Sequence, residues 1–152
     1  MSHNIKQLKP KKHGRTQQGY IDRKKCQKLF ESTKSEPIIF RSSWERVFIE
    51  WCETSPMVEK WGSECCKIKY DINGEHHTYY PDFVLQMKGG EIWVVEIKPL
   101  NETKKPLKPN SYAWNTYCKN MYKWRAAKEF CESHGWKFKI FTEVTIKNLG
   151  NI

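Results

Sequence analysis

The clearest hydrophobic pattern in the chain is a helical one. Trp44, Phe48 and Trp51 recur at the intervals i, i+4 and i+7, so they share one face of a helix. A serine at position 42 or 43 can cap its first turn. The pattern therefore predicts an amphipathic helix that begins at Ser42 or Ser43 and ends near residue 53.

A different alternation, with a period of two, follows in residues 77–86 and 91–98. A turn at Gly89 and Gly90 separates these segments, and a hairpin centred on Gly89 places Asp82 opposite Glu96. Both faces of this hairpin are apolar. On the carboxylate side are Val84, Ile92 and Val94; on the other are Phe83, Leu85, Trp93, Val95 and Ile97. A sheet that is apolar on both faces is covered by helices on both sides.

The remaining segments complete an α/β pattern. We expect a connector and a strand over residues 61–70, a turn at 71–74, a long helix over 111–134 that Gly135 ends, and a last strand over 136–142. A helical crossover before the last strand suits parallel pairing. The sequence thus predicts a mixed central β-sheet flanked by helices, in a domain that covers residues 37–152.

Positive charge is concentrated ahead of that domain. The chain has 27 Lys and Arg against 17 Asp and Glu, and residues 1–36 alone hold ten basic and three acidic side chains. We interpret residues 1–36 as a basic N-terminal arm, extended or partly ordered, with a short helix near residues 24–31. Such an arm binds a polyanion or serves only to keep the protein soluble.

Composition excludes several classes of protein. No apolar run approaches the length of a membrane span, and the N-terminus is too polar for a secretory signal. Six cysteines show no regular spacing and no C-x-x-C motif, which favours reduced thiols over a disulfide framework or a structural zinc site. We therefore expect one soluble, intracellular domain that does not bind membranes.

The facing carboxylates carry the chemistry. Asp82 and Glu96 repel each other across the hairpin, so the fold needs a cation there. Lys98, which lies on the same face, is one candidate, and a divalent metal is the other. Mg²⁺ binds a few oxygen ligands and keeps several waters, so these two carboxylates and the Ile97 carbonyl would form an incomplete cage. A metal in this cage would polarise a phosphodiester oxygen and activate a bound water, and Lys98 is placed to orient that water for attack.

Glu45 is the acid of the first helix that lies at the border of the apolar stripe. It can therefore face the sheet as a further metal ligand and catalytic carboxylate. Ser42 and Glu45 also fit a capping box, in which the Glu45 side chain binds a backbone amide instead. The sequence leaves both interpretations open.

These four residues resemble the active site of the PD-(D/E)-x-K nuclease superfamily, in which Pro81 and Asp82 form the first part of the motif. The resemblance covers residues 42–143 and implies a restriction-endonuclease-like fold. It also implies catalytic Glu45, Asp82, Glu96 and Lys98, with one or two Mg²⁺ or Mn²⁺ ions. Within it, four segments are similar to the endonuclease subunit of cut-and-paste transposition systems: residues 41–45, 61–64, 80–83 and 141–143.

The whole chain, including residues 11–15 and 18–20, is still more similar to the small head-completion nucleases of large contractile-tailed phages. That resemblance implies hydrolysis of phosphodiester bonds in packaged phage DNA before heads join tails. It implies the host cytoplasm as the location during virion assembly, with retention in the virion as an option. Portal, neck or head proteins are the implied protein partners.

DNA would be bound through its phosphates, with low sequence specificity. The basic residues that we expect to contact it are Lys9, Lys11, Lys12, Arg15, Lys24, Lys25, Arg41, Lys104, Lys105, Lys108, Lys119 and Lys123. Aromatic residues of the long helix could stack on bases, although their helical spacing favours core packing. His76 and His77 read as surface residues at the end of a hairpin rather than as metal ligands.

Two other functions remain possible on these grounds. One is a structural head or neck protein that binds DNA on a nuclease scaffold. The other is an endonuclease subunit of a transposition or restriction system that acts with a second protein.

Overall fold

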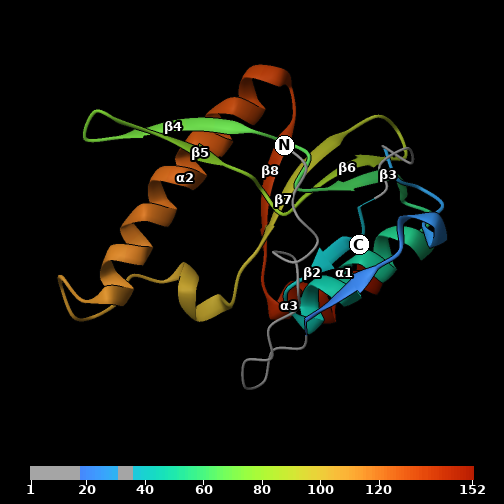
Figure 1. The fold of residues 1–152 in the computed structure, drawn as a ribbon, viewed down its shortest axis with the longest axis horizontal. Helices are drawn as coiled ribbons and strands as arrows, with labels where there is room; N and C mark the ends of the chain where they lie inside the picture. The colour runs from blue at the N-terminus through green and yellow to red at the C-terminus, as the bar shows by residue number, and fades with distance from the viewer. Residues whose placement is uncertain (1–17, 31–35) are drawn as a thin grey trace.

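A computed structural model describes residues 18–30 and 36–152 and shows an α/β fold around a mixed sheet (Figure 1). The sheet has four strands in the order β3-β6-β7-β8, with only the β7–β8 pair parallel. Their bounds are Val58–Ser63 (β3), Phe83–Met87 (β6), Ile92–Ile97 (β7) and Lys137–Phe141 (β8). The predicted fold class is confirmed.

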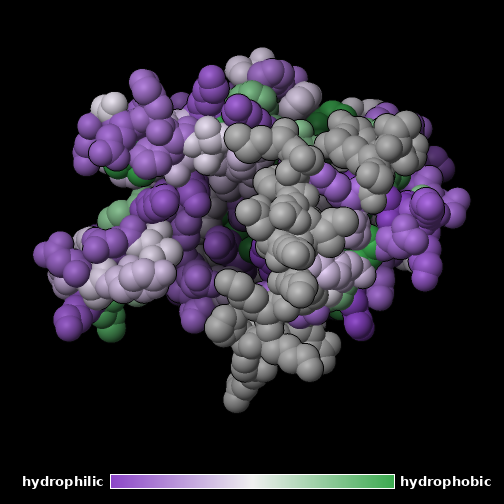
Figure 2. Space-filling view, in the orientation of Figure 1, coloured by the Kyte–Doolittle hydropathy of each residue, from purple (hydrophilic) through white to green (hydrophobic). Residues whose placement is uncertain are grey.

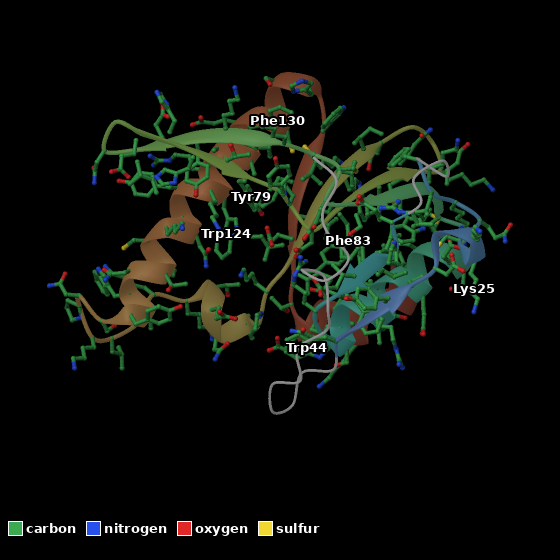
Figure 3. All side chains as sticks on the ribbon, in the orientation of Figure 1. Lys25, Trp44, Tyr79, Phe83, Trp124 and Phe130 are labelled. Carbon is green, nitrogen blue, oxygen red and sulfur yellow. The ribbon has the colours of Figure 1, made fainter. Side chains whose placement is uncertain are left out.

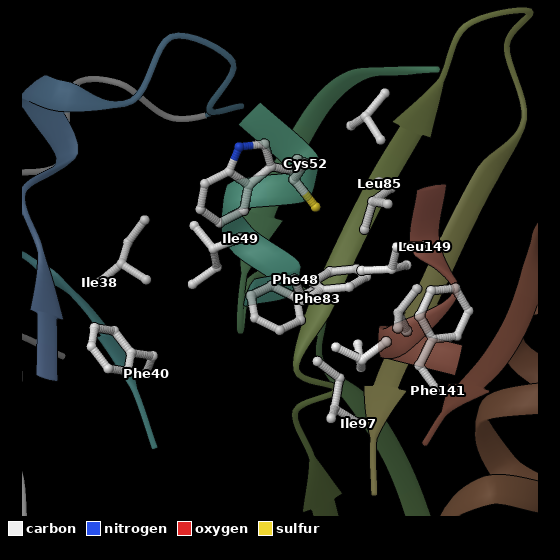
Figure 4. Packing of buried hydrophobic residues seen from close by; sticks show 14 of the residues in the cluster. Ile38, Phe40, Phe48, Ile49, Cys52, Phe83, Leu85, Ile97, Phe141 and Leu149 are labelled. Carbon is white, nitrogen blue, oxygen red and sulfur yellow. The ribbon is translucent and has the colours of Figure 1, made fainter. Parts of the chain in front are cut away.

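Helices cover both faces of this sheet, as its apolar faces predict. The helices α1 (Ser43–Thr54) and α3 (Glu143–Lys147) lie on one side, and α2 (Tyr112–His134) lies on the other (Figure 1). Phe48 of α1 packs on Phe83 with a centroid distance of 4.7 Å, inside the cluster drawn in Figure 4. On the opposite face, Trp124 of α2 belongs to the same buried cluster as Val94.

The hairpin has the predicted register, but its first strand is shorter than predicted. Phe83 pairs with Val95 and Leu85 pairs with Trp93, as a centre at Gly89 requires. The predicted strand 77–86 is interrupted at residues 80–82, because Pro81 has no amide hydrogen to donate to a strand ladder. Asp82 thus lies immediately before β6, in register to face Glu96 but outside the ladder.

Residues before the interruption form a separate sheet. Strands β4 (Ile68–Ile72) and β5 (Glu75–Tyr79) pair through a two-residue turn in which Asn73 and Gly74 both have positive φ. This hairpin packs on α2 rather than extending the central sheet. The connector and strand predicted over residues 61–70 correspond to the loop after Ser63 and to β4, whereas β3 was not predicted.

The hydropathy pattern predicts that the folded domain starts at Pro37. The structure shows that it starts earlier in the chain. Strands β1 (Gly19–Ile21) and β2 (Ile38–Phe40) form an antiparallel pair, and Leu29 is buried beside Trp61. The helix predicted near residues 24–31 is only a 3-10 turn, η2 (Arg23–Lys25). Lys28 explains why a basic segment packs here, since its ammonium donates to the carbonyls of Cys52, Ser55 and Val58 near the end of α1.

Two further 3-10 turns, η3 (Leu100–Thr103) and η4 (Leu149–Asn151), were not predicted, and neither was α3. The long helix and last strand agree with prediction, and Gly135 ends α2 with a positive φ of 71°. Within the residues that the structure describes, none of the helices has an apolar stretch suited to crossing a bilayer. The predicted DNA contacts Lys9, Lys11, Lys12 and Arg15 lie outside the described residues.

Candidate active site

A pocket of about 570 Å³ lies where α1 begins and β7 ends. It brings together the four side chains that the motif predicts, although they come from three separate parts of the fold. Glu45 comes from the first turn of α1, Asp82 from the residue before β6, and Glu96 and Lys98 from the end of β7. The lining residues are Arg41, Ser42, Ser43, Trp44, Glu45, Asp82, Glu96, Ile97, Lys98 and Pro99.

Asp82 is fixed by two strand ends. Its Oδ2 accepts a hydrogen bond from the Ile97 amide at 2.8 Å, and its carbonyl accepts one from the Glu64 amide at 3.0 Å. Burial raises the pKa of its carboxyl to about 7, with a further increase from Glu45, while the Ile97 amide and Lys98 act in the opposite direction. Near neutral pH this carboxylate therefore needs an additional positive charge.

Glu96 needs a positive charge even more clearly. The side chain is only 6% exposed, and its Oε2 is buried with no hydrogen-bond partner among residues 18–30 and 36–152. Burial raises the pKa of its carboxyl to about 7, and the nearby Lys98 and Lys123 only partly offset that increase. A buried carboxylate oxygen without a donor is costly, and a bound divalent cation removes that cost.

Glu45 serves the helix end as well as the pocket. Its Oε2 accepts a hydrogen bond from the Arg41 amide, while the Ser42 hydroxyl accepts one from the Glu45 amide at 3.2 Å. This resembles the capping box, except that the glutamate reaches the residue before the N-cap. The side chain is 9% exposed, and burial raises the pKa of its carboxyl. One oxygen is thus used by the backbone, and the residue still lines the pocket.

Glu64 is a further acid at the site that residue patterns did not single out. Its carboxylate forms an ion pair with the Arg41 guanidinium at 2.6 Å, at the edge of the pocket. Its backbone has a positive φ of 49°, which is uncommon for a residue other than glycine. The only sequence signal for it was the family resemblance of residues 61–64. Arg41, predicted as a DNA contact, is therefore already paired with an acid.

The oxygen atoms available suit Mg²⁺ or Mn²⁺ as an incomplete cage. Asp82 and Glu96 supply carboxylates, and Ile97, whose backbone carbonyl is the predicted third ligand, lines the same pocket. In residues 18–30 and 36–152 no three His, Cys, Asp or Glu side chains converge closely enough to hold a metal by themselves. His76 instead bonds Asp71 on the β4–β5 hairpin, at 2.5 Å. Waters or substrate would have to complete the coordination.

Lysines that were predicted to bind DNA occupy different places. Lys123 of α2 approaches the site. Burial lowers the pKa of its ammonium, while Glu96 and Asp82 raise it. Its Nζ lies 5.5 Å from the Tyr79 ring centroid. Lys119, one turn earlier on α2, lowers the pKa of Lys123 further. By contrast, Lys25 lies far from Trp44, which borders the pocket (Figure 3). Lys24 is next to Lys25 in the 3-10 turn η2.

Comparisons with known proteins identify the family of the chain. Residues 55–143 match the sequence model of the TnsA-like endonuclease N-terminal family. That range contains Asp82, Glu96 and Lys98, whereas Glu45 precedes it. The chain is also 35% identical to the head completion nuclease of Enterobacteria phage T4, in an alignment that covers 74% of this chain and 83% of that protein.

Proposed function

The chain belongs to the TnsA-like endonuclease family, and from that premise we propose that it is a metal-dependent nuclease that hydrolyses phosphodiester bonds in phage DNA during head completion. Glu96 is the observation that carries the proposal, because its Oε2 is buried with no partner among the described residues, in a pocket that a second buried carboxylate, Asp82, also lines. A structural scaffold has no use for two acids whose burial opposes their ionised forms. A metal site requires both.

We assign each residue of the site a part in this reaction. Asp82 and Glu96 would hold Mg²⁺ or Mn²⁺, together with the Ile97 carbonyl. When bound, the ion polarises a phosphate oxygen and makes hydroxide available near neutral pH. Whether one or two ions bind depends on Glu45, whose Oε2 is engaged by the Arg41 amide.

Lys98 would orient the attacking water and stabilise the negative charge that develops on the phosphate. Its backbone is held in place, since the Lys98 amide donates to the Phe141 carbonyl at 2.9 Å. Lys123 approaches the same site from α2 and would contact a neighbouring phosphate. Lys119, Lys104, Lys105 and Lys108 would extend that contact along the DNA backbone without reading its sequence.

The place of action is also part of the proposal. Similarity to a head completion nuclease supports a role in head completion. The proposed substrate is packaged phage DNA, and the proposed location is the host cytoplasm during virion assembly. A portal or neck protein is the partner that this role calls for, and the basic residues of segment 1–36 would bind that protein or the DNA. Copies retained in the finished virion would be consistent with the same role.

Incubation of the full chain with supercoiled plasmid and with linear duplex tests the proposal. We expect Mg²⁺ or Mn²⁺ to support conversion of supercoiled plasmid to nicked and linear forms, and EDTA to abolish it. Cleavage of the closed plasmid identifies endonuclease action, whereas degradation of linear DNA alone identifies exonuclease action. Folded protein that cuts neither DNA with either metal would contradict the proposal.

A further inference from the structure

A second pocket, of about 370 Å³, lies beside the candidate active site. It is formed between the first half of α2 and residues 101–107, which comprise most of η3 and the loop after it. The two pockets adjoin along the chain, because Pro99 lines the first and Asn101 lines the second. A strand of DNA whose phosphate enters the first pocket would therefore pass close to the second.

The edge of this second pocket is unusually apolar for a solvent-exposed surface. Leu107 is fully exposed and Tyr112 is 88% exposed, the two highest values among large hydrophobic side chains in the described residues. The next most exposed, Tyr80 and Val144, reach only 52%. Hydrophobic surface interrupts the hydrophilic one at the lower left of Figure 2, where the loop that enters α2 lies. Exposed apolar side chains around a cavity indicate a binding site.

A buried amide also lines the pocket. Asn120 is only 5% exposed, and its Nδ2 has no hydrogen-bond partner in the part of the chain that the structure describes. Leaving a buried donor unpaired costs stability, so an apolar residue would suit a purely structural role better. An amide can donate to and accept from the edge of a nucleobase. Tyr117, three residues earlier on α2, adds an aromatic ring to the same lining.

The charges favour a nucleic acid over a protein as the occupant. Lys104 and Lys105 line the pocket against a single acid, Glu102. The Lys105 ammonium lies 4.8 Å from the Trp114 ring centroid, an arrangement that holds it at α2. Cations that track a backbone, next to aromatic rings on which bases stack, are how proteins hold single-stranded nucleic acid.

We propose that this pocket binds an unstacked nucleobase of the DNA substrate, next to the phosphate that is cleaved. The inference rests on the proposed nuclease function, and it adds a preference for DNA with an unpaired or frayed strand at the cleavage site. Tyr112 and Tyr117 supply the stacking surfaces, Asn120 bonds the base edge, and Lys104 and Lys105 hold the flanking phosphates.

Fluorescence anisotropy tests the pocket without cleavage. The full chain is titrated, in EDTA, into a labelled duplex with a short single-stranded overhang. The comparison is the same duplex with an overhang of abasic nucleotides, which keeps every phosphate and removes only the bases. We expect wild type to bind the base-bearing overhang about tenfold more tightly, the effect of stacking about one base.

Two variants locate the effect. Asn120→Leu replaces an unpartnered amide with an apolar side chain of similar size, so its thermal stability should be unchanged or higher. Tyr112→Ala changes an exposed residue. In each variant, the affinity ratio between the base-bearing and abasic overhangs should be about twofold or less, because one stacked base supplies the wild-type ratio. The affinity for blunt duplex should be unchanged. Tyr122→Ala, which removes a partly exposed ring that lines a different pocket, should keep the preference.

Equal affinity of wild type for the two overhangs would overturn the proposal and leave Leu107 and Tyr112 to a protein partner. Full retention of the preference in both Asn120→Leu and Tyr112→Ala would also overturn it. Because the readout is binding in EDTA, it is independent of catalysis. An inactive protein that still prefers the base-bearing overhang would refute the proposed nuclease activity and leave the pocket standing.

Discussion

The carboxylate of Asp82 accepts a hydrogen bond from the Ile97 amide at 2.8 Å, which ties the residue before β6 to the last residue of β7. This bond replaces the strand pairing that Pro81 interrupts. It also holds one oxygen of Asp82 at the end of β7, in the pocket that Glu96 lines. The backbone therefore fixes the Asp82 carboxylate in the same pocket as Glu96.

Activity should depend on both acids and on Lys98. We expect Asp82→Asn, Glu96→Gln and Lys98→Ala each to lower plasmid cleavage at least about 100-fold, since each removes a few kcal/mol of transition-state stabilisation. Asp71→Asn, on the exposed strand β4, and Lys88→Ala, in an exposed turn, are matched controls at residues that do not line the pocket, and both should retain activity. Unchanged cleavage by any of the three site variants would remove that residue from the catalytic assignment.

Stability should fall as pH rises when no divalent metal is present. The folded-state pKa values of Asp82 and Glu96 are raised to about 7 from 3.8 and 4.5, so the folded protein holds more protons than the unfolded chain between about pH 4 and 7. Relative to the double variant Asp82→Asn/Glu96→Gln, the wild-type melting temperature should drop by at least about 5 °C from pH 5 to pH 8. If the melting temperatures of the two proteins, measured by calorimetry, change in parallel with pH, these carboxyl groups do not titrate as described.

Metal binding should reverse that loss. At pH 8, millimolar Mg²⁺ should raise the melting temperature of wild type by a few degrees, because a ligand that binds only the folded state stabilises it. The same addition should leave Asp82→Asn/Glu96→Gln unchanged, and this variant should be the more stable protein in EDTA. An equal Mg²⁺ effect on both proteins would place the ion elsewhere.

Glu45→Gln separates the two roles of Glu45. Glutamine keeps an oxygen that can accept from the Arg41 amide, so the helix end should remain intact and stability should change by less than about 1 kcal/mol. If the charge of Glu45 also serves the metal, cleavage should fall at least about tenfold. Full activity of Glu45→Gln, with activity lost only in Glu45→Ala, would assign the residue to capping alone.

The salt dependence of DNA binding should report the lysines near the site. If six or more phosphates are neutralised, affinity should fall by roughly 10³-fold or more between about 50 and about 200 mM salt. Replacing Lys104, Lys105 and Lys108 by alanine should reduce the slope of log affinity against log salt by about two to three. Lys24→Ala/Lys25→Ala, in a turn that lies apart from the pocket, should leave this slope almost unchanged. A smaller slope in this double variant, with no change in the triple variant, would place the DNA path at η2 instead.

The hairpin was the most predictable part of the fold, because a double-glycine turn and period-two alternation fix its register without tertiary contacts. Leu29 could not be placed, since it lies in a basic, polar stretch without periodicity and is buried only because Lys28 anchors that stretch to the end of α1. The proximity of Lys123 to Glu96 was also invisible, because it depends on where α2 crosses the sheet.

Glu45 shows a different limit. Its position on α1 was predictable from helical geometry, but the choice between capping and the pocket was not, because the same side chain does both. Glu64 had no hydropathy signal at all. Its place at the pocket edge follows from an ion pair with Arg41 and a positive φ, neither of which a sequence pattern reveals.

The most direct test of the metal site is the anomalous scattering of crystals of the full chain soaked in Mn²⁺. We expect a peak within coordination distance of the carboxylates of Asp82 and Glu96, with the Ile97 carbonyl adjoining it. A peak bound by other side chains, in protein that cleaves plasmid with Mn²⁺, would contradict the assignment of these two acids as the metal ligands.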